Sequence, residues 1–144
     1  MDPVHKHFAT EFAEAIVARD FAAAHRMLAP WLQLTMSPAD LQELVEARLR
    51  EMMEYAGCDE LTYPVAYEVD GNICTLEDLQ EPSSYAPPRP IPPDVTPENF
   101  RKWACIQFLA DEEVDIDAWF DLWAILVEAD GRYGVGYFEL EDPD

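Results

Sequence analysis

The chain has few of the residues that cross-link a protein, and it lacks the segments that would carry it into a membrane. Its three cysteines, Cys58, Cys74 and Cys105, are odd in number and widely spaced, which argues against a disulfide framework and fits reduced thiols. No apolar run reaches the ~18 residues that a membrane-spanning helix needs. The first residues show no charged-then-apolar signal pattern. The sequence therefore favours a soluble cytoplasmic protein.

Basic residues are also scarce. Nine Lys and Arg stand against 30 Asp and Glu, which gives a formal net charge of -21 over 144 residues. Such a surface repels nucleic acid and anionic membranes and attracts basic partners. A solubilising or salt-adapted surface explains the same charge without any partner, and this interpretation stays open. Hydrophobic residues still make up 49% of the chain, so one domain over residues 1–144 can bury a core.

Short motifs that identify common active sites are missing. The sequence contains no G-x-S-x-G, no P-loop and no G-x-G-x-x-G, and no Cys or His spacing matches a zinc site. The acidic run 111–117 fails as a calcium loop, because Ile116 stands where that loop needs glycine. We therefore expect no cofactor and no metal ion.

Three helices are predicted before residue 58. Apolar residues at spacings of three and four predict the first helix over residues 3–18. Asp20 is expected to cap a second, short helix over 21–28. Ser37, followed by proline and then an acidic residue two positions later, has the pattern of a helix start. This third helix is expected to end at Gly57, a residue type that readily adopts the left-handed conformation of a helix C-terminus.

The hydrophobic period then changes from 3.6 to 2. Alternation over residues 61–69 predicts a half-buried strand, in which Pro64 indicates an edge or a bulge. Asp-Gly-Asn at 70–72 predicts a turn into a short second strand over 73–76. The nearly continuous apolar run 103–109 predicts a strand that is covered on both faces.

A proline-rich stretch separates these strands. Residues 77–97 are predicted to form an extended, partly polyproline loop, inserted into the single domain, because prolines at this density break helices and central strands. The spacing from Pro87 to Pro90 fits the P-x-x-P pattern that SH3-type partners bind. A rigid loop wrapped over the domain is the favoured alternative.

The C-terminal stretch 117–140 predicts a β-hairpin. Asp-Gly at 130–131 lies between two β-prone runs, and a type I′ turn requires positive φ at both of its central residues. A two-residue turn pairs Ala124 with Tyr137 and Leu122 with Glu139.

This pairing gives the hairpin two apolar faces. The three helices are expected to cover the face made of Phe120, Leu122, Ala124, Leu126, Val135 and Tyr137. The other face is expected to contain Trp119, Trp123, Ile125, Val127, Phe138 and Leu140. Because leaving either face wet would forfeit several kcal/mol, at roughly 1.5–3 kcal/mol per large side chain, the proline-rich loop, a second subunit or both should cover this outer face. We expect a homodimer through it.

The order of elements predicts an α+β fold, with three N-terminal helices packed on a curved antiparallel sheet. The segments FAEAIVARDFAAAHRMLAPWL, SPADLQELVEARL and GRYGVGYFEL resemble bacterial nuclear-transport-factor-2-like (NTF2-like) domains. The resemblance covers about residues 4–55 and 100–140, and the proline-rich insertion departs from the family pattern. It implies a cone-like fold whose mouth often holds a ligand or an active site, but no catalytic residue of the family maps onto this chain.

Candidate binding residues lie on the predicted sheet. Asp121 is expected between Trp119 and Trp123 on an otherwise apolar face. Burial raises the pKa of a carboxyl group, so a buried Asp121 would serve as a general base. The hydrogen-bonding candidates beside it are Tyr63, Tyr67 and Tyr137, and Trp123 completes the set. The alternative is a solvated Asp121 with tyrosines that pack in the core and expose their hydroxyls at the rim.

Three functional classes follow from these observations. The favoured class is a non-enzymatic binding or interaction domain with a small-molecule pocket between helices and sheet. The second is an acidic, immunity-type protein that neutralises a basic partner, as the NTF2-like resemblance and the net charge imply; an extended run 111–117 would present its carboxylates to that partner as a ladder. The third is a small NTF2-like enzyme that uses a buried carboxylate.

Overall fold

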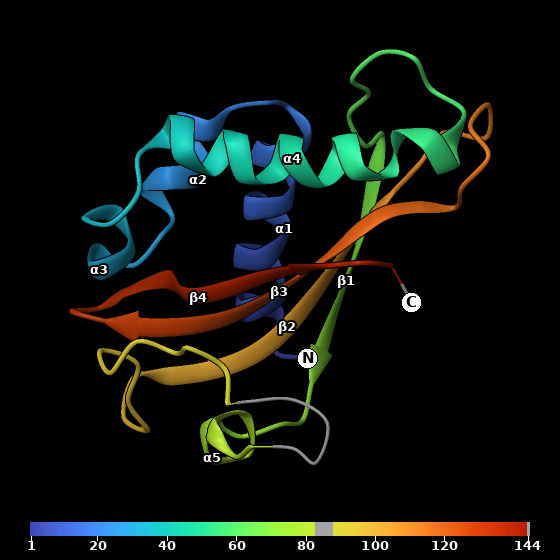
Figure 1. Ribbon diagram of the computed structural model, residues 1–144. Helices are drawn as coiled ribbons and strands as arrows, with labels where there is room; N and C mark the ends of the chain where they lie inside the picture. Colours follow the sequence, from blue (N-terminus) through green and yellow to red (C-terminus); the bar gives the residue numbers. More distant parts are fainter. Residues whose placement is uncertain (83–87, 144) are drawn as a thin grey trace.

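Helices from the first 56 residues pack on one face of a four-stranded antiparallel sheet in the computed structural model (Figure 1). The structure describes residues 1–82 and 88–143. The strand order is β1-β2-β3-β4, and the sheet is curved and unclosed. The α+β class predicted from the order of elements is confirmed.

The helical half follows the local signals closely. Its helices are α1 (Pro3–Val17), α2 (Phe21–Arg26), α3 (Pro30–Gln33) and α4 (Pro38–Ala56). The side chain of Asp20 accepts a hydrogen bond from the backbone of Ala23 at the start of α2, and Ser37 forms a capping box at the start of α4. Gly57 ends α4 with φ of 71°. The short helix α3 was not predicted: its Pro30 occupies the first helical position, where a missing N–H costs nothing.

The middle of the chain differs from the prediction. The strands are β1 (Ala66–Asn72), β2 (Phe100–Leu109), β3 (Ala118–Ala129) and β4 (Arg132–Glu141). The turn predicted at 70–72 is wrong, because these residues pair with residues 103–105 of β2 and continue β1. The strand predicted over 73–76 is also wrong. Thr75 and Asp78 form a capping box there, which starts the helix α5 (Leu76–Gln80) inside the segment expected to be a loop.

The P-x-x-P prediction rests on Pro87, which lies outside the described residues. The acidic run 111–117 is not an extended ladder, because the amide of Val114 bonds to the carbonyl of Asp111 and the amide of Glu113 to the carboxylate of Asp111. Residues 111–117 instead form turns and bends.

The C-terminal hairpin forms, with a register that changes partway along β4. Asp130 and Gly131 have φ of 55° and 75°, as a type I′ turn requires. The pairs nearest the turn are as predicted up to Leu126 with Val135. Beyond them the register shifts by one residue, so that Ala124 pairs with Phe138 and not with Tyr137. Gly136 is the extra residue of this β-bulge.

The bulge exchanges the two faces of the second half of β4, because a shift of one residue turns every later side chain to the opposite side of the sheet. Phe138 and Leu140 pack against the helix-side core, whereas Tyr137 packs on the outer face. A second irregularity, between Phe108 and Leu109 of β2, likewise brings Trp119 to the helix side. The predicted faces are therefore wrong for these four residues.

Side chains fill the space between helices and sheet. The largest completely buried ones on this side come from α1, α4, β2 and β3, and they are Trp119, Phe12, Phe108, Phe120, Ile16, Leu41, Leu49, Ile106, Leu122, Leu126 and Val45. At roughly 1.5–3 kcal/mol for each such side chain, this core provides the main stabilisation of the fold.

The chain covers part of its own outer sheet face. Helix α5 and the segment around Ile91 and Val95 lie on the side of the sheet opposite to α4 (Figure 1). They pack against Trp103, Ile125 and Val127. The predicted cover by the proline-rich segment is thus present over this end of the face. The chain alone covers this end, and no second subunit is needed there.

Substituting Gly136 with alanine should destabilise the protein. A Cβ at this position would stand 2.8 Å from Cγ1 of Val127 and 3.2 Å from Cζ2 of Trp31, so we expect a loss of about 1–3 kcal/mol from overpacking. Urea unfolding followed by circular dichroism measures it. Gly131→Asn is the matched control, because nothing lies within 4 Å of the Cβ it would add and asparagine tolerates positive φ. Equal losses in both variants would contradict the packing argument.

Candidate functional site

The five residues proposed from the sequence do not converge on one site. Tyr63 and Tyr67 lie on the helix side of the sheet. Trp123 and Tyr137 pack on the outer face. Asp121 is two residues from Trp123 in the same regularly paired stretch of β3, so it shares the outer face. The sheet therefore separates the two groups.

Tyr63 belongs to a polar cluster between α4 and the segment that precedes β1. Its hydroxyl donates a hydrogen bond of 2.5 Å to Oε2 of Glu46, and the guanidinium of Arg19 lies 4.1 Å above its ring. Burial, and then the bond to Glu46, raise the pKa of Tyr63 well above its usual value. The same bond, followed by one from Gln42, lowers the pKa of Glu46. A phenol held in this way anchors the structure rather than transferring protons.

Tyr137 belongs to a second cluster, on the outer face. Its hydroxyl donates a 2.6 Å hydrogen bond to Glu139, which also forms a 3.0 Å ion pair with Arg89. Burial and the bond to Glu139 raise the pKa of Tyr137. Arg89 lies 5.4 Å from the ring centre of Trp103, which stacks on Trp123 at 5.2 Å. These contacts hold the segment that contains Arg89 against the sheet.

Asp121 is buried, with 3% of its surface exposed. Its neighbours on the adjacent strands are Gln107 and Glu141. Trp119 lies on the opposite face, so the expected setting of Asp121 between two tryptophans is not formed. Within residues 1–82 and 88–143, no group of three or more His, Cys, Asp or Glu side chains is placed to hold a metal ion.

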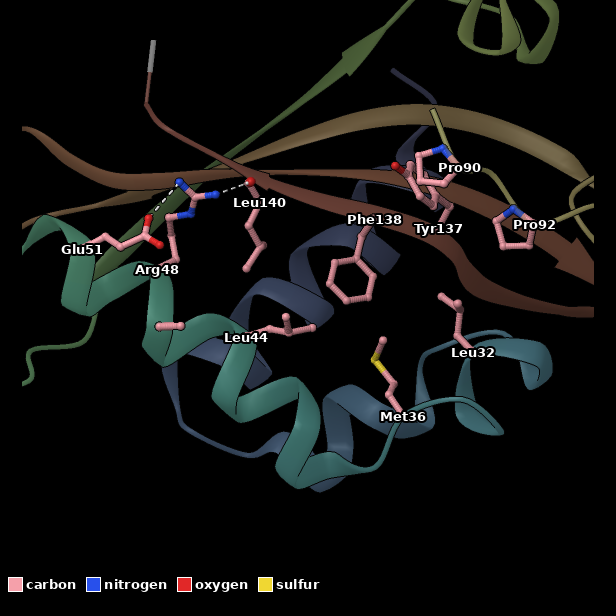
Figure 2. A pocket seen from close by; sticks show the side chains of 11 residues that line it. Leu32, Met36, Leu44, Arg48, Glu51, Pro90, Pro92, Tyr137, Phe138 and Leu140 are labelled. Atoms are coloured by element: carbon pink, nitrogen blue, oxygen red, sulfur yellow. Dashed lines mark hydrogen bonds and ion pairs between the residues drawn. The ribbon is translucent and has the colours of Figure 1, made fainter. Parts of the chain in front are cut away.

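A different feature has the shape of a binding site: a groove between α4 and β4, with a volume of about 480 Å³ (Figure 2). Leu44 of α4 faces this groove and is 45% exposed. Phe138 and Leu140 of β4 line the facing wall. The remaining lining residues are Leu32, Met36, Ala47, Arg48, Glu51, Pro90, Pro92 and Tyr137. This volume lies within the range of about 300–1,000 Å³ that is typical of ligand sites.

Arg48 closes one end of the groove. Its guanidinium donates a 2.8 Å hydrogen bond to the carbonyl of Leu140 and lies 2.9 Å from the carboxylate of Asp142. A third contact, of 3.2 Å, joins it to Glu51 (Figure 2). The side chain of Arg48 is only 25% exposed, so this end is a preformed polar wall beside an apolar surface.

Sequence reasoning missed the groove because it placed Phe138 and Leu140 on the outer face. The signal that could have corrected this is the pair of glycines at 134 and 136, since glycine inside a strand often indicates a bulge. By their spacing in the sequence, Leu44 and Arg48 share one helical stripe with Leu41 and Val45. That stripe could not show that part of it would remain open.

Comparison with known proteins finds no match: no protein-family model, curated protein or solved structure is significantly similar to this chain. Over the part of the chain that the structure describes, no helix has both the length and the apolar character needed to cross a membrane. The functional argument therefore rests on the geometry of the groove and on the charge of the chain.

The hydrogen bond between Tyr63 and Glu46 should stabilise the fold in a pH-dependent way. Tyr63→Phe keeps the ring but removes the donor, which should lower the free energy of unfolding at neutral pH by about 1.5–3 kcal/mol. Folding lowers the pKa of Glu46, so this contribution is complete above the ordinary glutamate pKa and is lost as the pH falls through the lowered value. Urea unfolding across a pH series measures it.

Tyr55→Phe is the control for this substitution, because Tyr55 is 68% exposed and its hydroxyl should contribute little. A Tyr63→Phe penalty of the same size in acid and at neutral pH would show that the carboxylate of Glu46 is not the partner that matters.

Proposed function

We propose that this protein is a non-enzymatic binding module of the NTF2-like type, and that its ligand occupies the groove between α4 and β4. One observation carries the proposal: an exposed leucine, Leu44, faces Phe138 and Leu140 across an open space that ends at the fixed guanidinium of Arg48. Apolar walls with a few fixed polar groups are typical of ligand sites.

The packing of the rest of the domain supports this location. Large side chains fill the space between α1, α4 and the sheet, so a hollow cone is not where a ligand would lie. The groove lies between α4 and the edge strand β4, and the apolar side chains that line it are accessible. A small apolar molecule or an apolar side chain of another protein has the chemistry to fill it.

Binding is favoured over catalysis by the distribution of the candidate residues. An acid–base mechanism needs its groups within about 2.6–3.2 Å of the reacting atoms. Tyr63 and Tyr67 are separated from Asp121 by the sheet, and the hydroxyls of both tyrosines are bonded to glutamates. A cytoplasmic location and a homodimer through the open part of the outer face complete the proposal.

A second candidate is an acidic, immunity-type protein that neutralises a basic partner. The formal net charge of -21 favours it, because a strongly acidic surface accelerates and orients association with a basic protein. It differs from the main proposal in requiring a protein partner, and its complex should weaken sharply as the salt concentration rises.

The groove can be tested with Nile red, a neutral apolar dye whose fluorescence rises when it leaves water. We expect saturable binding that Leu44→Arg weakens by about tenfold or more, equivalent to about 1.4 kcal/mol, because the new side chain fills and charges the groove. Leu34→Arg is the matched control, since Leu34 is 89% exposed and is not among the residues that line the groove. Circular dichroism checks that both variants fold. If Leu44→Arg left Nile red binding intact, the groove would not be the site.

A further inference from the structure

The outer edge of β4 is partly occupied by the chain itself. Strand β4 is last in the sheet, so one row of its backbone groups points away from β3. Near the hairpin, the amide of Val135 bonds to the carbonyl of Met27 and its carbonyl accepts from the amide of Ala29, at 2.9 and 2.8 Å. Leu28 forms a parallel bridge to Val135. This edge therefore already accepts an added strand-like segment.

Two side chains, one at each end of the groove, cap the outer edge of β4 by bonding to its backbone carbonyls. Nε1 of Trp31 donates to the carbonyl of Gly136 at 2.9 Å, and Arg48 donates to the carbonyl of Leu140. Between these caps lies a stretch of about 13 Å, at ~3.3 Å per residue, with Phe138 at its centre.

The backbone of Phe138 faces this open stretch. Residues two apart in a strand direct their backbone groups to the same side, and the carbonyl of Leu140 points to Arg48 of α4. The amide and carbonyl of Phe138 therefore also point outward, into the groove. Among residues 1–82 and 88–143, no residue outside the sheet forms a hydrogen bond to either group.

An extended segment satisfies this geometry better than a helix. A strand paired with β4 would lie about 4.8 Å from it and would bond to the amide and carbonyl of Phe138. A helix, which is ~10 Å wide, has its backbone groups bonded internally and would bury those of Phe138 without partners, at a cost. Alternate side chains of a strand would point toward Leu44 and Met36, which makes apolar residues suitable at every second position.

The charge around the groove selects a basic occupant. Arg48, the one cation among the groove's described lining residues, contacts two carboxylates, those of Glu51 and Asp142. These carboxylates are 63% and 79% exposed, so this end carries excess negative charge, as does the whole chain at -21. Lysine or arginine at the positions that alternate with the apolar ones would complement it.

From these observations we infer that the groove takes an extended segment of another protein, with alternating apolar and basic residues, that pairs its backbone with Phe138 of β4. This inference rests on the proposed function, because it names the occupant of the same groove. The inference goes beyond the proposed function, because it requires that the occupant pair its backbone with β4 and carry positive charge.

Selection from a random library of displayed peptides about ten residues long tests the inference on the whole chain. The selected sequences should alternate apolar and basic residues. Binding of a synthetic representative, measured by titration calorimetry, should weaken about tenfold or more with Leu44→Arg and stay unchanged with the control Leu34→Arg. It should also weaken as salt is added.

N-methylation of single peptide amides tests the backbone pairing. Methylation of an amide that faces Phe138 should abolish binding, whereas methylation of the next amide, which faces solvent, should leave it unchanged. Selected sequences that are acidic or have a helical period, or a representative that tolerates every N-methyl group, would overturn the inference. A library that yields no binder at Leu44 would also overturn it, and Nile red binding that Leu44→Arg removes would then show that the proposed groove site itself still stands.

Discussion

The register of β4 controls most of what is distinctive in this structure. Gly136 lies where a side chain would meet Val127 and Trp31, and its carbonyl accepts a hydrogen bond from the indole of Trp31. The bulge at this glycine shifts the rest of β4 by one residue. Phe138 and Leu140 thereby reach the helix side and form a wall of the groove, while Tyr137 joins the outer face. Without the bulge, the groove would have different chemistry.

The sheet is covered on its helix side and over one end of its outer side, and this explains where a binding site remains. The helices α1, α2 and α4 cover one face, and α5 with the segment around Ile91 and Val95 covers one end of the other. A core packed this closely leaves room for a ligand mainly where two elements diverge. Helix α4 and the edge strand β4 leave such a space beside Leu44, which is why the binding proposal is placed between them.

Three of the nine basic residues are placed where elements meet. Arg48 joins α4 to the end of β4, Arg89 joins its loop to Glu139, and Arg101 on β2 pairs with Glu128 on β3. Exposed ion pairs contribute little each, roughly 0–1 kcal/mol, and nine basic residues cannot offset 30 acidic ones. The acidity of the surface is therefore available to a partner, and a basic segment is the occupant that the groove suits best.

The sequence by itself determined the features that depend on neighbouring residues. The caps at Asp20 and Ser37, the left-handed Gly57 and the positive-φ turn at 130–131 are local, because each depends on one residue's backbone preference or on a hydrogen bond within one helical turn. Hydrophobic periodicity likewise identified the long helices and the strands that close the chain, and with them the α+β class.

Only the tertiary structure decided how these elements combine. Pairing with β2 turned the expected turn at 70–72 into strand, although its local composition favours a turn. The bulge at Gly136 depends on Trp31, which is 105 positions away along the chain, and no local pattern encodes that contact. The candidate residues of the sheet were divided between its two faces, and Phe138 was brought to face Leu44, for the same reason. Side-chain direction in a strand changes with every residue of register, and register is set by packing between distant segments.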